Sequence, residues 1–246
     1  MDPLKYMLGK WVYGYSVPLN VIKLLNIKED HTLCLIGSGL GETAMLAYLE
    51  TKAQVNGFEI HPQLVMQAEN RTRRKGLSNK IKYHNLSDLD AMRFSNVDAV
   101  FFESILSYLK NPDDVLSKAI TCLKPGGRLG VVEVVWTQQP SFHDRKLLTN
   151  LLGEEMSPRN THEWMDVFHK QDLKTIYYAF RKPGFFIKLW DDMKASPVYM
   201  FPNLFKTLYS VAMSAQSRSA LNNFLSFFKY FKSKMKVECY VLEKKL

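Results

Sequence analysis

Short apolar segments alternate along the chain with longer stretches in which apolar residues recur every three or four positions. The first pattern is typical of buried β-strands and the second of amphipathic helices. The apolar segments predict strands at 32–36, 54–59, 80–84, 99–102, 128–135, 175–181 and 237–243. The helical pattern predicts one or two helices in 4–26, two or three in 185–232, and others at 41–52, 62–76, 112–123 and 162–171. Residues 137–160 are polar and are expected to be irregular.

This alternation of strands and helices predicts an α/β fold with a doubly wound, mostly parallel sheet of seven strands. Three parts are expected: an N-terminal helical cap at 1–30, a core formed by 31–184 and 237–246, and an aromatic, basic helical insertion at 185–236. Ligands of such sheets bind at the carboxyl ends of the strands. Candidate binding residues are therefore those that follow the strands.

Three glycines at alternate positions, Gly37, Gly39 and Gly41, follow the first strand and lead into a helix. Glycines at such a junction let backbone N–H groups approach a ligand closely. The spacing differs from that of dinucleotide-binding loops, and the Lys-Ser/Thr of a phosphate-binding loop is absent. Glu59 ends the second strand, where a carboxylate accepts hydrogen bonds from ribose hydroxyls in βαβ nucleotide folds. An ordinary surface glutamate at a strand end is the alternative interpretation.

The composition is that of a globular chain, with 46% hydrophobic and 23% charged residues. No apolar run approaches the ~20 residues that span a bilayer, and the N-terminus lacks the pattern of a secretory signal. Cys34, Cys122 and Cys239 are far apart, which suggests neither a metal site nor a disulfide framework. Reduced thiols of a cytoplasmic protein are the simplest interpretation.

The charge is unevenly distributed. Of the net charge of +9, residues 181–246 carry +8, from twelve Lys or Arg and four Asp or Glu. Basic and aromatic residues are interleaved near the end of this segment: Phe227, Phe228, Lys229, Tyr230, Phe231, Lys232, Lys234 and Lys236. Interfacial helices have this pattern, and so do proteins that bind single-stranded nucleic acid. An apolar helix face beside a solvated lysine face is a third interpretation.

The order of these signals resembles that of class I S-adenosylmethionine-dependent methyltransferases. The similarity covers about residues 30–136 and rests on four motifs: the loop at 35–41, the acid in 58–60, Asn85-Leu86-Ser87-Asp88-Leu89 ahead of Asp98, and Leu123-Lys124-Pro125-Gly126-Gly127 before a valine-rich strand. The resemblance implies a Rossmann-like methyltransferase fold, S-adenosyl-L-methionine as cofactor and S-adenosyl-L-homocysteine as product. Residues 103–112 are similar to enzymes that act on small molecules and lipids, such as the ubiquinone/menaquinone C-methyltransferases.

Two positions depart from the family pattern. Leu35 replaces the acid that usually helps to hold the methionine amino group, and Glu42, Glu103 or a backbone carbonyl is expected to take that contact. The Asn-Pro-Pro-Tyr motif of many methylases of nucleic acids and proteins is also absent, because Glu103-Ser104 stands in its place. The three dispersed cysteines argue against an arsenite methyltransferase, which needs converging thiolates.

The resemblance implies cofactor-binding roles for nine residues: Gly37, Ser38, Gly39, Gly41, Glu59, Ile60, Asp88, Leu89 and Glu103. The glycines would contact the methionine part and the ribose, and Glu59 the ribose hydroxyls. Asp88 and the Leu89 N–H would bind the adenine, with Ile60 and Phe94 on its faces. A solvated turn acid is the alternative for Asp88, and core packing is the alternative for Ile60 and Phe94.

No catalytic base is assigned from the sequence. Because a sulfonium is already activated, the protein mainly has to align the acceptor and exclude water. A base is added where the acceptor atom carries a proton, and the candidates are Glu103, Tyr108, Glu133, His143 and Asp144. Two solvated loop residues are the alternative interpretation of His143 and Asp144. Tyr13 and Tyr15 either close over the cofactor or pack against the core.

The leading hypothesis is methyl transfer to an apolar or amphipathic small molecule or lipid-like acceptor, with residues 185–236 as the substrate lid. The protein would be cytoplasmic and in peripheral contact with a membrane surface through that segment. One alternative is an RNA or protein methyltransferase that docks its substrate through the basic C-terminal segment. Another is a non-catalytic module that only binds S-adenosylmethionine.

Overall fold

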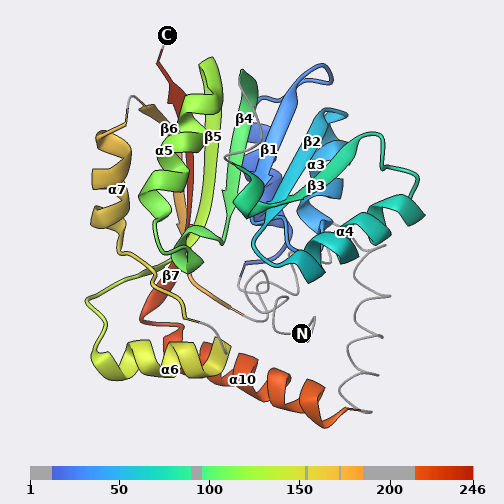
Figure 1. Ribbon diagram of the computed structural model, residues 1–246. Helices are drawn as coiled ribbons and strands as arrows, with labels where there is room; N and C mark the ends of the chain where they lie inside the picture. Colours follow the sequence, from blue (N-terminus) through green and yellow to red (C-terminus); the bar gives the residue numbers. More distant parts are fainter. Residues whose placement is uncertain (1–12, 90–95, 153–154, 172, 185–213, 246) are drawn as a thin grey trace.

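The computed structural model describes residues 13–89, 96–152, 155–171, 173–184 and 214–245 (Figure 1). They form one seven-stranded sheet in the order β3-β2-β1-β4-β5-β7-β6. The strands are β1 (Thr32–Ile36), β2 (Gln54–Glu59), β3 (Ile81–Asn85), β4 (Val97–Glu103), β5 (Leu123–Trp136), β6 (Leu173–Arg181) and β7 (Met235–Lys244). Only β7 runs antiparallel to its neighbours, β5 and β6. The predicted seven-stranded, mostly parallel, doubly wound sheet is confirmed.

Helices cover both faces of the sheet because its central strands are apolar on both sides. Leu33 and Leu35 of β1 belong to one core cluster, whereas Cys34 and Ile36 belong to the other. The first cluster includes residues of α2 (Ser16–Leu24), α3 (Glu42–Thr51) and α4 (Pro62–Arg74). The second includes residues of α5 (Pro112–Cys122) and α7 (Thr161–His169). The layers seen in Figure 1 therefore follow from this burial pattern.

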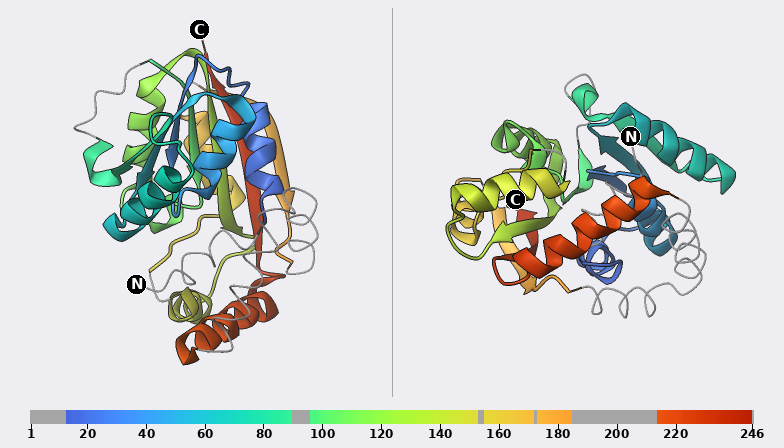
Figure 2. Two further views of the ribbon diagram at one scale, coloured as in Figure 1. Left: turned by 90° about the vertical axis from the view of Figure 1, so that its right-hand side faces the viewer. Right: turned by 90° about the horizontal axis from the view of Figure 1, so that it is seen from below.

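Two further helices, α6 (Phe142–Leu152) and α10 (Ala215–Phe231), pack against each other beyond the carboxyl ends of the parallel strands (Figures 1 and 2). Phe231 of α10 packs edge-on against Trp136, the last residue of β5, with 5.7 Å between ring centroids. The described part of the predicted insertion at 185–236 is therefore attached to the core. None of the described helices is long and apolar enough to cross a bilayer.

The expectation that residues 137–160 are irregular was wrong, because α6 lies within them. Ser141 and Asp144 start this helix with reciprocal bonds: Ser141 N donates to Asp144 Oδ2 at 2.9 Å, and Asp144 N donates to Ser141 Oγ at 3.1 Å. Leu148 is fully buried, and Leu147, Leu151 and Leu152 pack around the same cluster. The polar residues between these leucines obscured the helical pattern in the sequence. The helix is stabilised mainly by tertiary packing.

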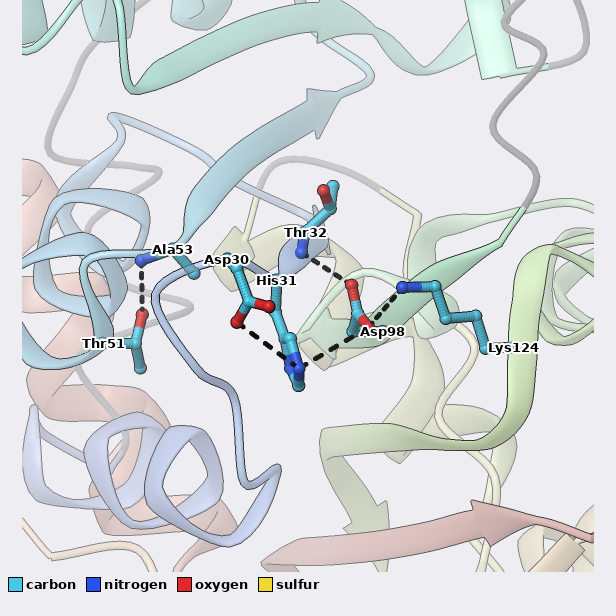
Figure 3. A network of polar contacts seen from close by, with 7 residues as sticks. All are labelled: Asp30, His31, Thr32, Thr51, Ala53, Asp98 and Lys124. Atoms are coloured by element: carbon cyan, nitrogen blue, oxygen red, sulfur yellow. Dashed lines mark hydrogen bonds and ion pairs between the residues drawn. The ribbon is translucent and has the colours of Figure 1, made fainter.

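Asp98 joins three strands at the amino-terminal end of the sheet (Figure 3). Its Oδ2 accepts a hydrogen bond from Thr32 N, which starts β1, at 2.9 Å. Its Oδ1 lies 2.6 Å from Lys124 Nζ at the start of β5 and 3.8 Å from His31 Nε2. Burial raises the pKa of Asp98, but the bonds from Lys124 and Thr32 outweigh burial and hold that pKa below its ordinary value.

Candidate functional site

The glycine loop, Gly37–Gly41, leaves the carboxyl end of β1 beside β2. Gly37 N and Ser38 N both donate to Phe58 O at 2.9 Å. Gly37, Gly39 and Gly41 have positive φ angles of 90°, 53° and 80°. Other residues are strained in this region, whereas glycine adopts it readily. The backbone of the loop therefore requires glycine at the three predicted positions.

Close packing adds a second requirement at two of these glycines. A Cβ atom on Gly37 would lie 2.5 Å from Glu103 O and 2.9 Å from Ile105 Cβ. A Cβ atom on Gly41 would lie 2.3 Å from Tyr83 Oη. The loop is therefore pressed against the end of β4 at one glycine and against a β3 side chain at the other.

Glu59, at the end of β2, is 3% exposed and holds the glycine loop to the start of α4. Its Oε2 accepts from Gly39 N at 2.8 Å. Its Oε1 accepts from Ile60 N at 2.8 Å and from His61 N at 3.2 Å. These bonds fix the carboxylate beside the loop, where βαβ nucleotide folds place a ribose-binding acid.

Ser38 supplies a further sign of a ligand at this loop. It is fully buried, and its Oγ is among the few buried side-chain polar atoms of the described residues that lack a hydrogen-bond partner. Buried polar atoms are nearly always bonded, so an orphaned hydroxyl in a glycine loop points to a ligand atom or water as its partner. A loop with glycine backbone and a fixed carboxylate fits the ribose and methionine parts of S-adenosylmethionine.

Glu103 ends β4 next to Gly37 and is 2% exposed. Its Oε1 accepts from Thr43 Oγ1 at 3.0 Å and from Tyr13 Oη at 3.3 Å. Tyr13 Oη also lies 2.9 Å from Ser104 Oγ. Burial, together with Glu103, raises the pKa of Tyr13 well above its ordinary value, so this phenol is a neutral donor.

Leu35, which stands where the family usually has an acid, is a core residue. Leu35 is fully buried within the cluster beneath α2 and α3. Glu42, one of the expected substitutes, accepts from Tyr15 Oη at 2.8 Å and pairs with Arg71 Nη2 at 2.9 Å. The backbone carbonyl of Glu103 packs against Gly37, and its carboxylate is bonded to Thr43 directly after the glycine loop, so Glu103 is the better candidate for the contact that Leu35 cannot make.

Residues expected at the adenine lie partly outside the described residues. Asp88 and Leu89 are in the short 3-10 helix Leu86–Leu89 after β3, but their side chains, like Phe94, are not described. Ile60 is half-buried and packs against the core cluster of the α5 face. The adenine roles of these residues stay predictions.

Asp144 and His143 lie on α6 rather than on the expected loop. Asp144 Oδ2 accepts from Ser141 Oγ at 2.7 Å, and Asp144 Oδ1 lies 2.6 Å from Lys234 Nζ. The Lys234 ammonium holds the pKa of Asp144 well below its usual range. These contacts favour a structural role that ties α6 to the start of β7. His143 is exposed and lies edge-on to Tyr230, with 6.1 Å between ring centroids.

The two remaining base candidates lie around the loop after β4. Tyr108 is half-buried and packs against the core. Glu133 is fully buried on β5 and accepts from Ile105 N and Leu106 N, both at 2.8 Å, and from Ser107 Oγ at 2.9 Å. Glu133 therefore lies behind this loop and is bound to its backbone.

Sequence reasoning missed two residues of the rim, Thr43 and Ser104. Thr43 lies in the first turn of α3, directly after the glycine loop. Its hydroxyl group at that position was the only feature of the sequence that could have indicated a role in the site. Ser104 has a positive φ of 51° and donates its N–H to Val132 O at 2.8 Å. Such a backbone conformation cannot be read from a serine in a sequence.

The three cysteines do not share a site. Cys34 and Cys122 belong to the core cluster on one face of the sheet, whereas Cys239 belongs to the cluster on the other. All three thiols are free. Burial raises the pKa of Cys34 and of Cys239 to about 12, so both are protonated at neutral pH. This separation excludes thiolates that converge from these three positions.

Residues 27–184 match the family model described as a methyltransferase domain. The methyltransferase phqN of Penicillium fellutanum is 31% identical over 134 residues, which are 52% of this chain and 40% of that relative. The chain thus spans less than half the length of this curated relative.

Solved structures share the fold at low identity. The phosphoethanolamine N-methyltransferase 2 of Haemonchus contortus, in complex with S-adenosylhomocysteine, has a TM-score of 0.75 at 17% identity, covering 98% of this chain and 57% of that one. The geranyl diphosphate C-methyltransferase of Streptomyces coelicolor has a TM-score of 0.67 at 15% identity, covering 93% and 78%. The match to the family model shows that the chain belongs to the methyltransferase-domain family.

Proposed function

We propose that this protein transfers the methyl group of S-adenosylmethionine to an apolar or amphipathic small molecule or lipid-like acceptor. The observation that carries the proposal is the rim where the glycine loop, Glu59 and Glu103 adjoin one another at the carboxyl end of the sheet. Gly37, Gly39 and Gly41 would bind the methionine part and the ribose, and Glu59 the ribose hydroxyls. Ser38 lies in the same loop. Asp88, Leu89 and Ile60 would bind the adenine.

Bound S-adenosylmethionine would supply a methyl group that its sulfonium already activates. The protein then has to bind the cofactor, orient the acceptor toward the methyl group and exclude water from the site. Glu59 and Glu103 place two buried carboxyl groups beside the glycine loop, which suits a cationic ligand. Thr43 and Tyr13 hold the Glu103 carboxylate in the position from which it would bind the methionine amino group.

A general base is needed only where the acceptor atom carries a proton. Tyr108 and His143 keep this role as predictions. Asp144 is engaged by Lys234 and Ser141, so a catalytic Asp144 would first have to break an ion pair.

The class of acceptor is inferred from the layer formed by α6 and α10. This layer contributes Leu148, Phe227 and Phe231 to the apolar cluster at the end of β5 and the start of β7, on the side where ligands of such sheets bind. Geranyl diphosphate, which gives the Streptomyces coelicolor enzyme its name, combines a hydrocarbon chain with a charged head. An acceptor of this amphipathic kind suits an apolar layer with basic residues around it. We propose that the segment 185–236, which includes α10, is the substrate lid; its residues 185–213 lie outside the described residues.

Titration calorimetry with S-adenosylmethionine and S-adenosylhomocysteine tests the cofactor site. Glu59→Ala removes a carboxylate that holds the loop and should weaken binding by about 100-fold, the equivalent of one or two charged hydrogen bonds. Glu69→Ala, an exposed acid on α4, is the control and should bind like the wild type. Transfer of labelled methyl to quinones, prenyl diphosphates and lipids then identifies the acceptor. Failure of the wild type to bind either ligand would overturn the proposal.

We also propose that the protein is cytoplasmic and contacts a membrane surface peripherally, through α6 as well as the expected 185–236 segment. Phe142 of α6 is 82% exposed and Leu225 of α10 is 48% exposed. The exposed basic residues of the two helices are Arg145, Lys146, Arg218 and Lys229, and the exposed Lys232 directly follows α10. Their one acid, Asp144, is buried in its pair with Lys234. Exposed apolar side chains among basic ones are typical of contact with anionic lipid.

Co-sedimentation with phosphatidylcholine vesicles, with and without phosphatidylserine, tests this contact. The wild type should bind the anionic vesicles, and Phe142→Ser with Leu225→Ser should weaken binding several-fold. Met66→Ser with Phe180→Ser removes side chains that are 56% and 58% exposed elsewhere on the surface and should change nothing. Equal losses in both double variants would contradict a localised membrane surface.

The same basic surface favours a second candidate, an RNA or protein methyltransferase that docks its substrate through the C-terminal segment. Salt-sensitive RNA binding that is lost when Lys229 and Lys232 are neutralised would support the RNA form. Absence of RNA binding at low salt would remove it. The alternative of a protein methyltransferase is tested by measuring methyl transfer from S-adenosylmethionine to a set of peptides with the purified protein.

A further inference from the structure

The buried carboxylate of Glu133 organises the loop that follows β4. Glu133 Oε1 accepts from Ile105 N and Leu106 N, both at 2.8 Å, and Glu133 Oε2 accepts from Ser107 Oγ at 2.9 Å. Ser107 O in turn accepts from Ser157 N at 2.8 Å. One carboxylate from β5 thus binds three consecutive residues of the loop.

The same loop presses on the cofactor-binding glycines. Gly37 packs so tightly here that an added Cβ would lie 2.9 Å from Ile105 Cβ and 2.5 Å from Glu103 O. Ile105 therefore contacts Gly37 through its side chain while its N–H is bonded to Glu133. A short, continuous set of contacts joins the carboxylate to the glycine loop.

We propose that Glu133 is a positioning residue whose ionised carboxylate holds the loop after β4 against the glycine loop, so that cofactor binding weakens when this carboxylate is protonated. The inference rests on the cofactor site of the proposed function. It gives the chain a pH-dependent cofactor affinity without any contact between Glu133 and the cofactor.

The environment of Glu133 puts this titration near neutral pH. Burial raises its pKa to about 7, although bonds from Leu106, Ser107 and Ile105 oppose that rise. Above this pH the carboxylate accepts strong charge-assisted bonds from the loop. Below it, one oxygen carries a proton and the bonds to the loop weaken.

Four titratable groups lie on the parts of the chain next to Glu133: Glu238 and Lys236 of β7, Glu103 of β4, and Tyr13. Glu238 stands opposite it on β7, and Thr161 Oγ1 and Lys236 Nζ bind that carboxylate at 2.7 and 2.8 Å. Although burial opposes the shift, the bond from Lys236 and those from hydroxyl groups keep the pKa of Glu238 below its ordinary value, so it stays ionised. Tyr13 is a neutral phenol, and Glu103 ends the adjacent strand β4.

Calorimetric titration of S-adenosylhomocysteine at pH 6, 7 and 8, in buffers of different ionisation enthalpy, tests the inference. The wild type should gain about five- to tenfold in affinity between pH 6 and pH 8 and release a fraction of a proton at pH 7, as linkage requires. Glu133→Gln is a neutral isostere that still accepts from Ile105 N and Leu106 N. At pH 6, 7 and 8 alike, this variant should bind S-adenosylhomocysteine as weakly as the wild type does at pH 6. It should not release the proton that the wild type releases from Glu133.

Two further variants separate positioning from simple loss of fold. Ser107→Ala removes a bond that lowers the pKa of Glu133, so the midpoint of the affinity profile should move to higher pH. Glu243→Gln, a neutralised acid beside Arg128 at the other end of β7, should leave the profile unchanged. The same pH slope in Glu133→Gln as in the wild type, or no slope in the wild type, would overturn the inference while leaving the cofactor site intact. Complete absence of binding by the wild type would overturn the proposed function and this inference together.

Discussion

The two ends of the sheet use carboxylates differently. At the amino-terminal end, Asp98 joins the starts of three strands through Thr32 N and the Lys124 ammonium (Figure 3). At the carboxyl end, Glu59 accepts backbone N–H groups from the glycine loop and the start of α4, and Glu133 accepts those of the loop after β4. The first arrangement fastens strands to one another, whereas the second fixes the shape of loops.

This difference predicts which property each end controls. Fastening strands contributes to the free energy of unfolding and leaves the distant cofactor site unchanged. Fixing loops holds backbone groups where a ligand needs them, which is how a rigid scaffold prepares a binding site. Substitutions at the two ends should therefore separate stability from cofactor affinity.

The largest effect is expected at Gly37. Gly37→Ala forces a Cβ to within 2.5 Å of Glu103 O at a φ of 90°, so we expect a loss of about 3 kcal/mol or more in stability and no measurable cofactor binding. Chemical denaturation and calorimetry measure the two quantities. Gly76→Ala is the matched control, because Gly76 also has a positive φ, of 69°, but a Cβ there meets nothing within 4 Å. It should cost about 1 kcal/mol and bind normally. If the two substitutions cost the same free energy of unfolding, the positive φ angle, and not the clash with Glu103 O, would account for the cost of Gly37→Ala.

A smaller effect, confined to stability, is expected at Asp98. Asp98→Asn loses charged hydrogen bonds to Lys124 and Thr32, which is expected to cost about 2 kcal/mol while cofactor affinity stays within twofold. Because the folded pKa of Asp98 is lowered, its contribution is complete above the unfolded pKa of about 4 and is lost as pH falls through the folded value. The stability difference between variant and wild type should therefore shrink in acid. A loss of cofactor affinity in Asp98→Asn would remove the distinction between the two ends.

Central strands such as β1 and β4 were predictable because burial on both faces leaves a largely apolar run. The bounds of β1 and β2 agree with the prediction to the residue. Helix α6 was missed because its leucines make sense only against α10, which is distant in sequence. The bounds of a helix held by tertiary packing do not follow from local periodicity alone.

The residues of the candidate site also fall into those that the sequence could predict and those that it could not. The glycines and Glu59 were predicted from their spacing along the chain, and the structure brings them together through the bond from Gly39 N to Glu59. Their cofactor roles stay predictions. Asp144 was considered as a base because its partner, Lys234, is 90 residues away and cannot be inferred locally. The bond of Glu103 to Thr43 spans 60 residues and was missed for the same reason. Residues whose function depends on a partner across the fold need the structure.

The smallest effect is expected at Tyr83, which supports the glycine loop from β3. Tyr83 Oη lies 2.9 Å from Thr72 Oγ1 and donates to Gly41 O at 3.4 Å. Tyr83→Phe keeps the ring but leaves the buried Thr72 hydroxyl without this partner, so we expect a loss of about 1 kcal/mol in denaturant unfolding. The positive φ of Gly41 and its bond to Ser38 O persist in the variant, so cofactor affinity should fall less than about threefold. Tyr48→Phe, on the half-buried α3 tyrosine, is the control for loss of a phenol. A tenfold or greater loss of affinity in Tyr83→Phe alone would mean that a single side-chain hydroxyl, rather than the loop's own glycine backbone and Glu59, sets the shape of the cofactor site.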